Sequence, residues 1–129
     1  DLLKEIPSSL QPAFCLCRSY SSEENGVQSQ KLEIQFEPQG IAGRRILLVD
    51  DICDTGKTLD ELQILCEERG ALEVKSAVLI HRIREDSCYN PTFAAFRYDG
   101  DEWFSGYGME DRNFAMNYPS VYRLRHIVD

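Results

Sequence analysis

The sequence contains no apolar run that approaches the length of a membrane-spanning helix, and no signal-peptide pattern opens the chain. Basic residues are also few, because 14 lysines and arginines stand against 22 aspartates and glutamates, giving a formal net charge of −8. An acidic chain lacks the basic surface that nonspecific DNA or RNA binding requires. These absences predict a cytoplasmic protein with no membrane partner and no nucleic-acid partner.

The cysteines are scattered, and they lack the second pair that would complete a zinc site. The five are Cys15, Cys17, Cys53, Cys66 and Cys88. Cys15 and Cys17 alternate along a predicted strand, and we expect all five to be reduced thiols in a cytoplasmic protein. The chain has 129 residues, of which 43% are hydrophobic, so it can form one domain with a modest core. We expect that domain to span residues 1–129.

The chain is organised around residues 45–59, where an apolar run is followed by acids and then by a polar turn. The run Ile46-Leu47-Leu48-Val49 predicts a short strand of a parallel sheet, buried on both faces. Asp50 and Asp51 follow it directly, and a helix is expected from Thr58 onward. The first N–H groups of a helix have no intrahelical partner, so such a helix start binds phosphate. The acid pair would repel a bare phosphate but suits sugar hydroxyls and a Mg²⁺ ion that bridges to the ligand.

Other interpretations of this stretch fit it less well. Gly56-Lys57-Thr58 looks like the end of a nucleotide triphosphatase loop, but that motif needs a glycine five positions before Gly56, where Asp51 stands. A phosphoacceptor domain also ends a strand in paired acids, yet it would leave the Thr-Gly-Lys-Thr run unexplained. An ordinary strand–helix turn with an aspartate cap would account for Asp54 and leave the acid pair and the threonines without a role.

Residues 49–58, Val-Asp-Asp-Ile-Cys-Asp-Thr-Gly-Lys-Thr, resemble the phosphoribosyl pyrophosphate signature of the type I phosphoribosyltransferases. The ending Asp-Thr-Gly-Lys-Thr is most similar to the hypoxanthine-guanine branch of that family. The resemblance covers essentially the whole chain but only the C-terminal portion of a typical family member, so we expect an N-terminally incomplete fold. An incomplete sheet has an uncovered edge, which favours association, and we expect a homo-oligomer.

The remaining pattern predicts an α/β fold, a mostly parallel sheet flanked by helices, with a β-hairpin flap. We expect the end of a helix over residues 1–6, followed by a hairpin with strands over 13–17 and 31–36 around an Asn25-Gly26 turn. A helix should begin at Thr58 and end at Gly70. Further strands are expected over residues 74–82, over 93–98, in the residues before Gly106, and over 121–128. The long helix carries an apolar face suited to packing on a sheet, formed by Leu59, Leu62, Leu65 and Cys66.

Residue chemistry alone makes the hairpin a solvated surface element. By resemblance it is the flexible loop of the family, in which Ser19 and Tyr20 would open a flap over the site. A closing flap would exclude water from a reaction that water could divert.

Residues 102–111 combine aromatics, glycines and acids. A planar ligand could stack on Trp103 or Phe104, and a core aromatic cluster in a strand explains the same residues equally well. The resemblance implies that this run binds a purine. Trp103 would then stack on the base, the backbone at Phe104 would contact its edge, and Glu110, usually an aspartate, would help to hold a metal ion.

His81 ends a strand beside the signature strand, so its side chain would emerge at the carboxyl edge of the sheet, where ligands bind in open α/β folds. A lone histidine at a strand end is more often structural than functional. The resembled family normally has a lysine here that donates to the 6-oxygen of the purine, whereas histidine lacks the permanent charge. Met116 stands where the family usually carries an arginine that contacts pyrophosphate.

The resemblance implies transfer of a phosphoribosyl group from phosphoribosyl pyrophosphate to hypoxanthine or guanine, with Mg²⁺ as cofactor. Asp50 and Asp51 would hold the ribose hydroxyls, directly or through Mg²⁺, and Asp54 would exchange a proton with purine N7 as general acid/base. The 5′-phosphate would be bound by Thr55, Gly56, Lys57 and Thr58. The alternative is a noncatalytic module that binds phosphoribosyl pyrophosphate or a nucleotide, favoured by the missing pyrophosphate loop and by Met116.

Overall fold

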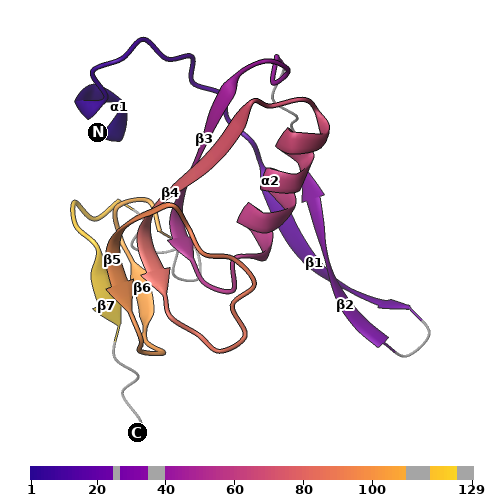
Figure 1. Cartoon of the computed structure of the whole chain (residues 1–129). Coiled ribbons are helices and arrows are strands. Elements are labelled where there is room, and N and C mark those ends of the chain that lie inside the picture. Colours follow the sequence, from indigo (N-terminus) through magenta and orange to yellow (C-terminus); the bar gives the residue numbers. More distant parts are fainter. Residues whose placement is uncertain (25–26, 35–39, 110–116, 125–129) are drawn as a thin grey trace, which may run out of the picture.

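The computed structural model describes residues 1–24, 27–34, 40–109 and 117–124, and for residues 18–32 it describes the backbone alone. Its elements are α1 (Leu2–Glu5), β1 (Cys17–Glu24), β2 (Val27–Ile34), β3 (Arg45–Cys53), α2 (Lys57–Glu68), β4 (Glu73–Arg82), β5 (Phe93–Tyr98), β6 (Trp103–Ser105) and β7 (Tyr122–Leu124). Figure 1 shows α2 beside the long strands β3 and β4, with the β1–β2 hairpin projecting away from them. The predicted α/β fold with a parallel sheet is confirmed.

The parallel sheet consists of β3, β4 and β5 in that order, and both neighbouring pairs are parallel. Because parallel strands need a crossover connection, β3 and β4 are joined by α2. The β4–β5 connection instead runs through residues 83–92, which form neither helix nor strand. Cys53 pairs with His81, and His81 pairs with Arg97, so the carboxyl ends of the three strands lie at one edge of the sheet.

The core lies where α2 packs against the sheet. Leu59 of α2 is buried with Cys53 of β3 and Val78 of β4, and the partly buried Leu48 packs against them. Gly70 follows the helix with a φ of +82°, and its N–H donates to the Glu67 carbonyl. This left-handed residue ends the helix where the sequence predicts, because glycine carries no Cβ to strain.

The prediction that β3 is buried on both faces was wrong. Leu47 and Val49 are 42% and 57% exposed, whereas Leu48 packs against the core. Successive side chains of a strand point to opposite faces, so burial alternates when α2 covers one of them. A continuous apolar run predicts a strand, but it does not show which faces are covered.

The hairpin differs from its predicted bounds. The first strand begins at Cys17 rather than at Ala13 and continues through polar residues to Glu24. The second strand is Val27–Ile34, and residues 35–36 of the predicted strand lie outside the described residues, as does the Asn25-Gly26 turn. The two strands pair in register from Cys17 with Ile34 to Glu24 with Val27. Backbone hydrogen bonds form this ladder, so apolar periodicity did not reveal its length.

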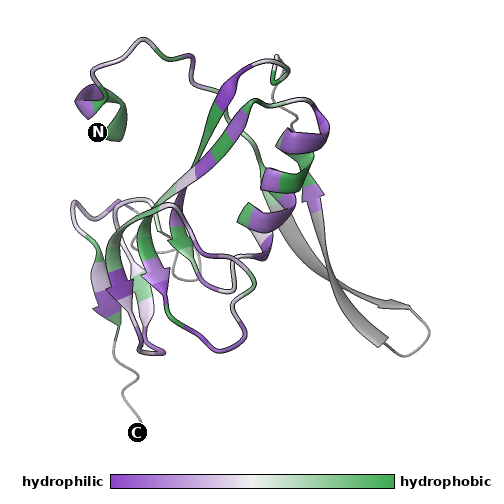
Figure 2. Cartoon of the chain, viewed as in Figure 1, coloured by the Kyte–Doolittle hydropathy of each residue, from purple (hydrophilic) through white to green (hydrophobic). Residues whose placement is uncertain are grey.

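The C-terminal strands form a separate pair. β6 and β7 are antiparallel, with Trp103 opposite Leu124 and Ser105 opposite Tyr122. Residues 125–128 of the predicted last strand lie outside the described residues. Figure 2 shows the change along β4 from an apolar middle to a hydrophilic tip. In the part of the chain that the structure describes, no helix is both long enough and apolar enough to cross a membrane.

Candidate functional site

The predicted ribose- and phosphate-binding residues lie on one strand–turn–helix segment. Asp50 and Asp51 belong to the last part of β3, residues 54–56 form the turn, and Lys57 begins α2. Gly56 is the N-cap residue, with a φ of +86°, and it has no side chain that could cap the helix. The start of α2 therefore directs its first N–H groups toward the turn, which is the arrangement that binds phosphate.

The acid pair places like charges together at the end of β3. Asp50 is half-buried, Asp51 is exposed, and the Asp51 N–H donates to Asp50 Oδ1 at 3.0 Å. Burial raises the pKa of Asp50 to about 6, and the charge of Asp51 adds to this effect. A cation beside the pair would relieve both the burial cost and the repulsion.

The donor set of this pair fits Mg²⁺. Carboxylate oxygens are ligands that Mg²⁺ prefers, and protein sites often supply one or two of them while the substrate and water supply the rest. Among the described residues, no group of three or more histidine, cysteine, aspartate or glutamate side chains could hold a metal ion. If a metal ion binds here, Asp50 and Asp51 are the carboxylates that would hold it.

Residues 83–92 contact the 54–56 turn and support it. The Cys88 N–H donates to the Thr55 carbonyl at 2.9 Å, and a Cβ on Gly56 would lie 2.4 Å from the Cβ of Tyr89. The Tyr89 hydroxyl donates to Gln63 Oε1 at 2.8 Å and hydrogen-bonds with the Ser76 hydroxyl at 3.0 Å. Tyr89 thus joins the turn, α2 and β4. The sequence predicts only a polar loop here, so this support was missed.

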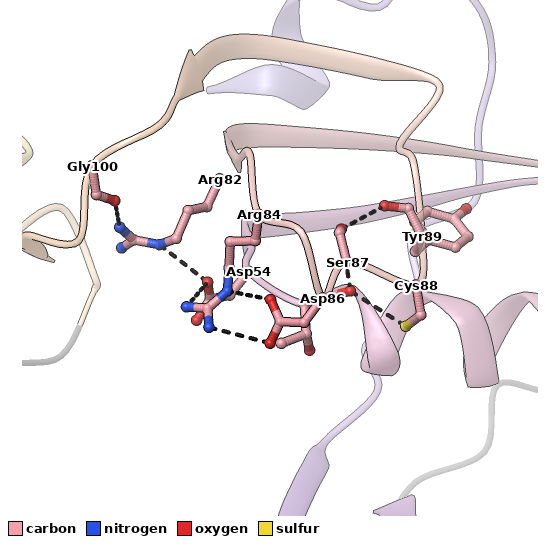
Figure 3. Close-up of polar contacts among 9 residues, drawn as sticks. Asp54, Arg82, Arg84, Asp86, Ser87, Cys88, Tyr89 and Gly100 are labelled. Atoms are coloured by element: carbon pink, nitrogen blue, oxygen red, sulfur yellow. Dashed lines mark hydrogen bonds and ion pairs between the residues drawn. The ribbon is translucent and has the colours of Figure 1, made fainter.

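Asp54 lies between two arginines that the sequence pattern did not single out (Figure 3). Its Oδ1 is 3.1 Å from Arg82 Nε and 3.4 Å from Arg84 Nη1, and its side chain is 49% exposed. Arg84 is itself exposed and also pairs with Asp86, with 2.7 Å between Nε and Oδ1. The predicted proton-exchanging carboxylate is therefore fixed in place and remains open to solvent.

Arg82 is 5% exposed and connects Asp54 to the β5–β6 connection. Its Nη1 donates to the Gly100 carbonyl and its Nη2 donates to the Glu102 carbonyl, the latter at 3.0 Å. The guanidinium carbon also lies 5.5 Å from the centroid of the Phe104 ring. A buried arginine requires such partners, since arginine is almost never fully buried unless paired. An arginine at the end of β4, one residue beyond His81 and the apolar run, was the available indication of this role.

His81 lies at the predicted end of β4, beside Cys53, but its side chain is buried rather than emerging from the sheet edge. Burial lowers the pKa of His81, and the positive charge of Arg97 lowers it further. The imidazole is therefore neutral near neutral pH, and its buried Nδ1 has no hydrogen-bond partner among the described residues. His81 lines a cavity of about 380 Å³ together with Arg84, Arg97 and part of the 83–92 connection.

The two predicted base-binding aromatics have different surroundings. Trp103 is 54% exposed, whereas Phe104 is half-buried and packs edge-to-face on Tyr98, with 5.1 Å between ring centroids. Phe104 also lines a second cavity of about 560 Å³, which is largely apolar. Phe104 therefore belongs to an aromatic cluster, whereas the stacking of a planar ligand on the exposed ring of Trp103 stays a prediction.

Other predicted residues are placed only in part. Ser19 and Tyr20 lie in β1, where their backbones pair with those of Leu32 and Lys31 on the projecting hairpin. Glu110 and Met116 lie outside the described residues. The structure thus brings the signature residues, His81 and the start of β6 to one region through Arg82, and leaves the flap apart from them.

Residues 2–112 match the family model of the phosphoribosyl transferase domain. The chain belongs to this family. It is 31% identical to the hypoxanthine-guanine phosphoribosyltransferase of Streptococcus pneumoniae (strain R6), over 99% of the chain and 71% of that relative. It is 33% identical to the enzyme of the same name from Lactococcus lactis, over 94% of the chain and 65% of that relative. Within the family, the chain therefore stands with the hypoxanthine-guanine phosphoribosyltransferases.

Solved structures of family members share this fold. A hypoxanthine phosphoribosyltransferase from Staphylococcus aureus superposes with a TM-score of 0.79 at 21% identity, covering 96% of this chain and 67% of that one. The hypoxanthine phosphoribosyltransferase from Trypanosoma cruzi, in complex with the product IMP, gives a TM-score of 0.67 at 21% identity, covering 74% and 52%. The strand–turn–helix segment thus belongs to a phosphoribosyltransferase fold.

Proposed function

We propose that this phosphoribosyltransferase acts in purine salvage. It would transfer the phosphoribosyl group of phosphoribosyl pyrophosphate to hypoxanthine or guanine, giving IMP or GMP and pyrophosphate. The observation that carries the proposal is the acid pair near the end of β3, which is followed by the 54–56 turn and by a start of α2 that no side chain caps. The identity to hypoxanthine-guanine phosphoribosyltransferases over nearly the whole chain supports the choice of purine.

The sugar phosphate is bound by the signature. Asp50 and Asp51 accept hydrogen bonds from the ribose hydroxyls or hold Mg²⁺, and the helix N-terminus binds the 5′-phosphate. The residues of this phosphate site are Thr55, Gly56, Lys57 and Thr58. Bound Mg²⁺ would neutralise the acid pair and the charge on the pyrophosphate group, and Glu110 would contribute to a second ion.

The base is bound by the β6 segment and by the end of β4. Trp103 stacks on the purine, the backbone at Phe104 contacts its edge, and His81 faces the 6-substituent. A neutral imidazole can donate a single hydrogen bond, so it can still recognise a 6-oxygen without a permanent charge. Asp54 exchanges a proton with N7, and its exposed side chain leaves its carboxylate accessible to the base.

Phosphoribosyl transfer passes through a transition state that resembles an oxocarbenium ion at the anomeric carbon. The protein contributes mainly by positioning the reactants and by placing charges around them. The hairpin that carries Ser19 and Tyr20 closes over the site and keeps water away from the anomeric carbon.

The test measures nucleoside monophosphate formation from labelled hypoxanthine, guanine or xanthine in the presence of phosphoribosyl pyrophosphate and Mg²⁺. We expect product with hypoxanthine and guanine, and we expect Asp54→Asn to lower kcat on the order of a hundredfold or more, because it removes the proton acceptor. Stabilisation of the wild-type protein by phosphoribosyl pyrophosphate without any product would instead identify a noncatalytic binding module.

A further inference from the structure

Arg82 makes contacts in two directions from a buried position. One edge of its guanidinium faces Asp54, with 3.1 Å between Nε and Oδ1. The other faces the β5–β6 connection, where Nη1 and Nη2 donate to the Gly100 and Glu102 carbonyls. Glu102 directly precedes Trp103 in the chain. One side chain therefore joins the signature turn to the segment that leads into β6.

We infer that Arg82 is a positioning residue that sets the location of Asp54 relative to the Trp103 segment. This inference rests on the proposed function for the roles of Asp54 and Trp103. Under that function, the base must touch the Trp103 ring and the Asp54 carboxylate at once, so their separation determines whether N7 reaches the carboxylate. A displacement of about 1 Å at such a contact can lower a rate by about a hundredfold.

The chemistry of arginine suits this role, and that of lysine does not. The guanidinium is planar and rigid, and each of its nitrogens has a separate partner among Asp54, Gly100 and Glu102. The ring faces of Tyr98 and Phe104 lie 5.8 Å and 5.5 Å from the guanidinium carbon and fix its remaining freedom. A lysine would keep the charge, but its single ammonium could not contact both Asp54 and the carbonyls of the β5–β6 connection at their present separation.

Neighbouring arginines provide matched controls, because each contacts only one end of this connection. Arg84 pairs with the same Asp54 oxygen at 3.4 Å, and the structure shows its other carboxylate contact at Asp86. Arg123 pairs with Glu102 Oε1 at 3.7 Å and donates to the Tyr98 hydroxyl at 3.4 Å. Both arginines are exposed, so replacing either by lysine changes its contact with Asp54 or with Glu102 and leaves the buried side chains in place.

The experiment compares Arg82→Lys with Arg84→Lys and Arg123→Lys. For Arg82→Lys we expect kcat to fall at least about tenfold and KM for the base to rise, with KM for phosphoribosyl pyrophosphate unchanged. We expect Arg123→Lys to stay within about threefold of the wild type in kcat and in both KM values. Arg84→Lys removes one contact of Asp54, so we expect it to lower kcat, but by less than Arg82→Lys does. An Arg82→Lys protein with wild-type kinetics would overturn the inference.

A second readout needs no substrate. Trp103 is the single tryptophan of the chain, so its emission maximum and its quenching by acrylamide report on the start of β6 alone. We expect Arg82→Lys to change both. We expect Asp54→Asn to change them as well, because Arg82 loses its charged partner at the other end and keeps only a weaker amide acceptor there. The two control variants should match the wild type. Circular dichroism verifies that each variant is folded, and Asp54→Asn provides the test if Arg82→Lys does not fold.

These readouts separate the inference from the proposed function. Wild-type protein that makes no nucleotide would contradict the proposed function, while the Trp103 emission of the variants would still decide the role of Arg82. Unchanged Trp103 emission in folded Asp54→Asn would overturn the inference even in an active enzyme.

Discussion

Asp50 has an environment that disfavours its charge. Burial and the neighbouring Asp51 raise its pKa to about 6, whereas a carboxyl in the unfolded chain has a pKa of 3.8. Below about pH 4 both states hold the proton and no penalty arises. Between about pH 4 and pH 6 the unfolded state releases its proton first, so the free energy of unfolding decreases as pH rises. Above about pH 6 the full penalty is present.

We therefore expect Asp50→Asn to be more stable than the wild type at about pH 8, by several degrees in Tm, and to be close to it at about pH 4. The difference between the two proteins isolates Asp50, since other groups titrate in both. Thermal unfolding followed by circular dichroism across this pH range measures it.

Magnesium provides the control for this prediction. If the acid pair holds the ion, Mg²⁺ should raise the Tm of the wild type at about pH 8 more than that of Asp50→Asn. A constant difference between the two proteins at every pH would contradict the assignment of the penalty to ionisation of Asp50.

At the scale of elements, the turn between β3 and α2 depends on a glycine for two separate reasons. Gly56 has a φ of +86°, a conformation that costs other residues about 1–2 kcal/mol. A side chain there would also overlap Tyr89, because its Cβ would lie 2.4 Å from the Tyr89 Cβ. Overlap of this kind adds about 1–3 kcal/mol.

We expect Gly56→Ala to lower the free energy of unfolding by both amounts together, and to weaken stabilisation by phosphoribosyl pyrophosphate. Gly43→Ala is the matched control, because Gly43 has a φ of +72° and a Cβ added there would meet nothing within 4 Å. Urea unfolding of both variants separates backbone strain from overlap. Equal decreases in the free energy of unfolding of the two variants would show that Tyr89 does not confine the turn.

Elements with both an apolar pattern and a clear end were predicted well from the sequence. β5 was placed at residues 93–98, and α2 ends before Gly70 because a left-handed residue stops it there. The signature is local, so its strand–turn–helix form could also be predicted. The role of Arg82 could not be predicted, because its carbonyl partners at Gly100 and Glu102 depend on the path of the later β5–β6 connection. The same limit applies to Tyr89 behind Gly56.

On the scale of the whole molecule, the hairpin and the core are distinct parts. The core centres on Cys53, Leu59 and Val78 under α2, and Figure 1 shows the β1–β2 hairpin projecting away from this region. A part that projects from the core can change its position at low cost in stability, which suits a flap.

We expect a shortened hairpin to keep the stability of the protein and to lose its activity. Tyr20 and Lys31 are paired in register, so residues 21–30 can be replaced by an Asn-Gly turn between them. Tm should stay within a few degrees, while nucleotide formation falls and water competes for the anomeric carbon. Calorimetry and a product assay measure the two effects, and a large decrease in Tm would place the hairpin in the folding core instead.

The support of the signature turn by Tyr89 bears on the order in which the protein is synthesised. The turn at Gly56 leaves the ribosome well before Tyr89, and the Cys88 N–H that binds the Thr55 carbonyl comes equally late. A nascent chain that ends at Ile80 contains every residue of the signature but lacks the side chain that confines it. The phosphate site is therefore completed by translation of a segment that contributes none of its phosphate-binding groups.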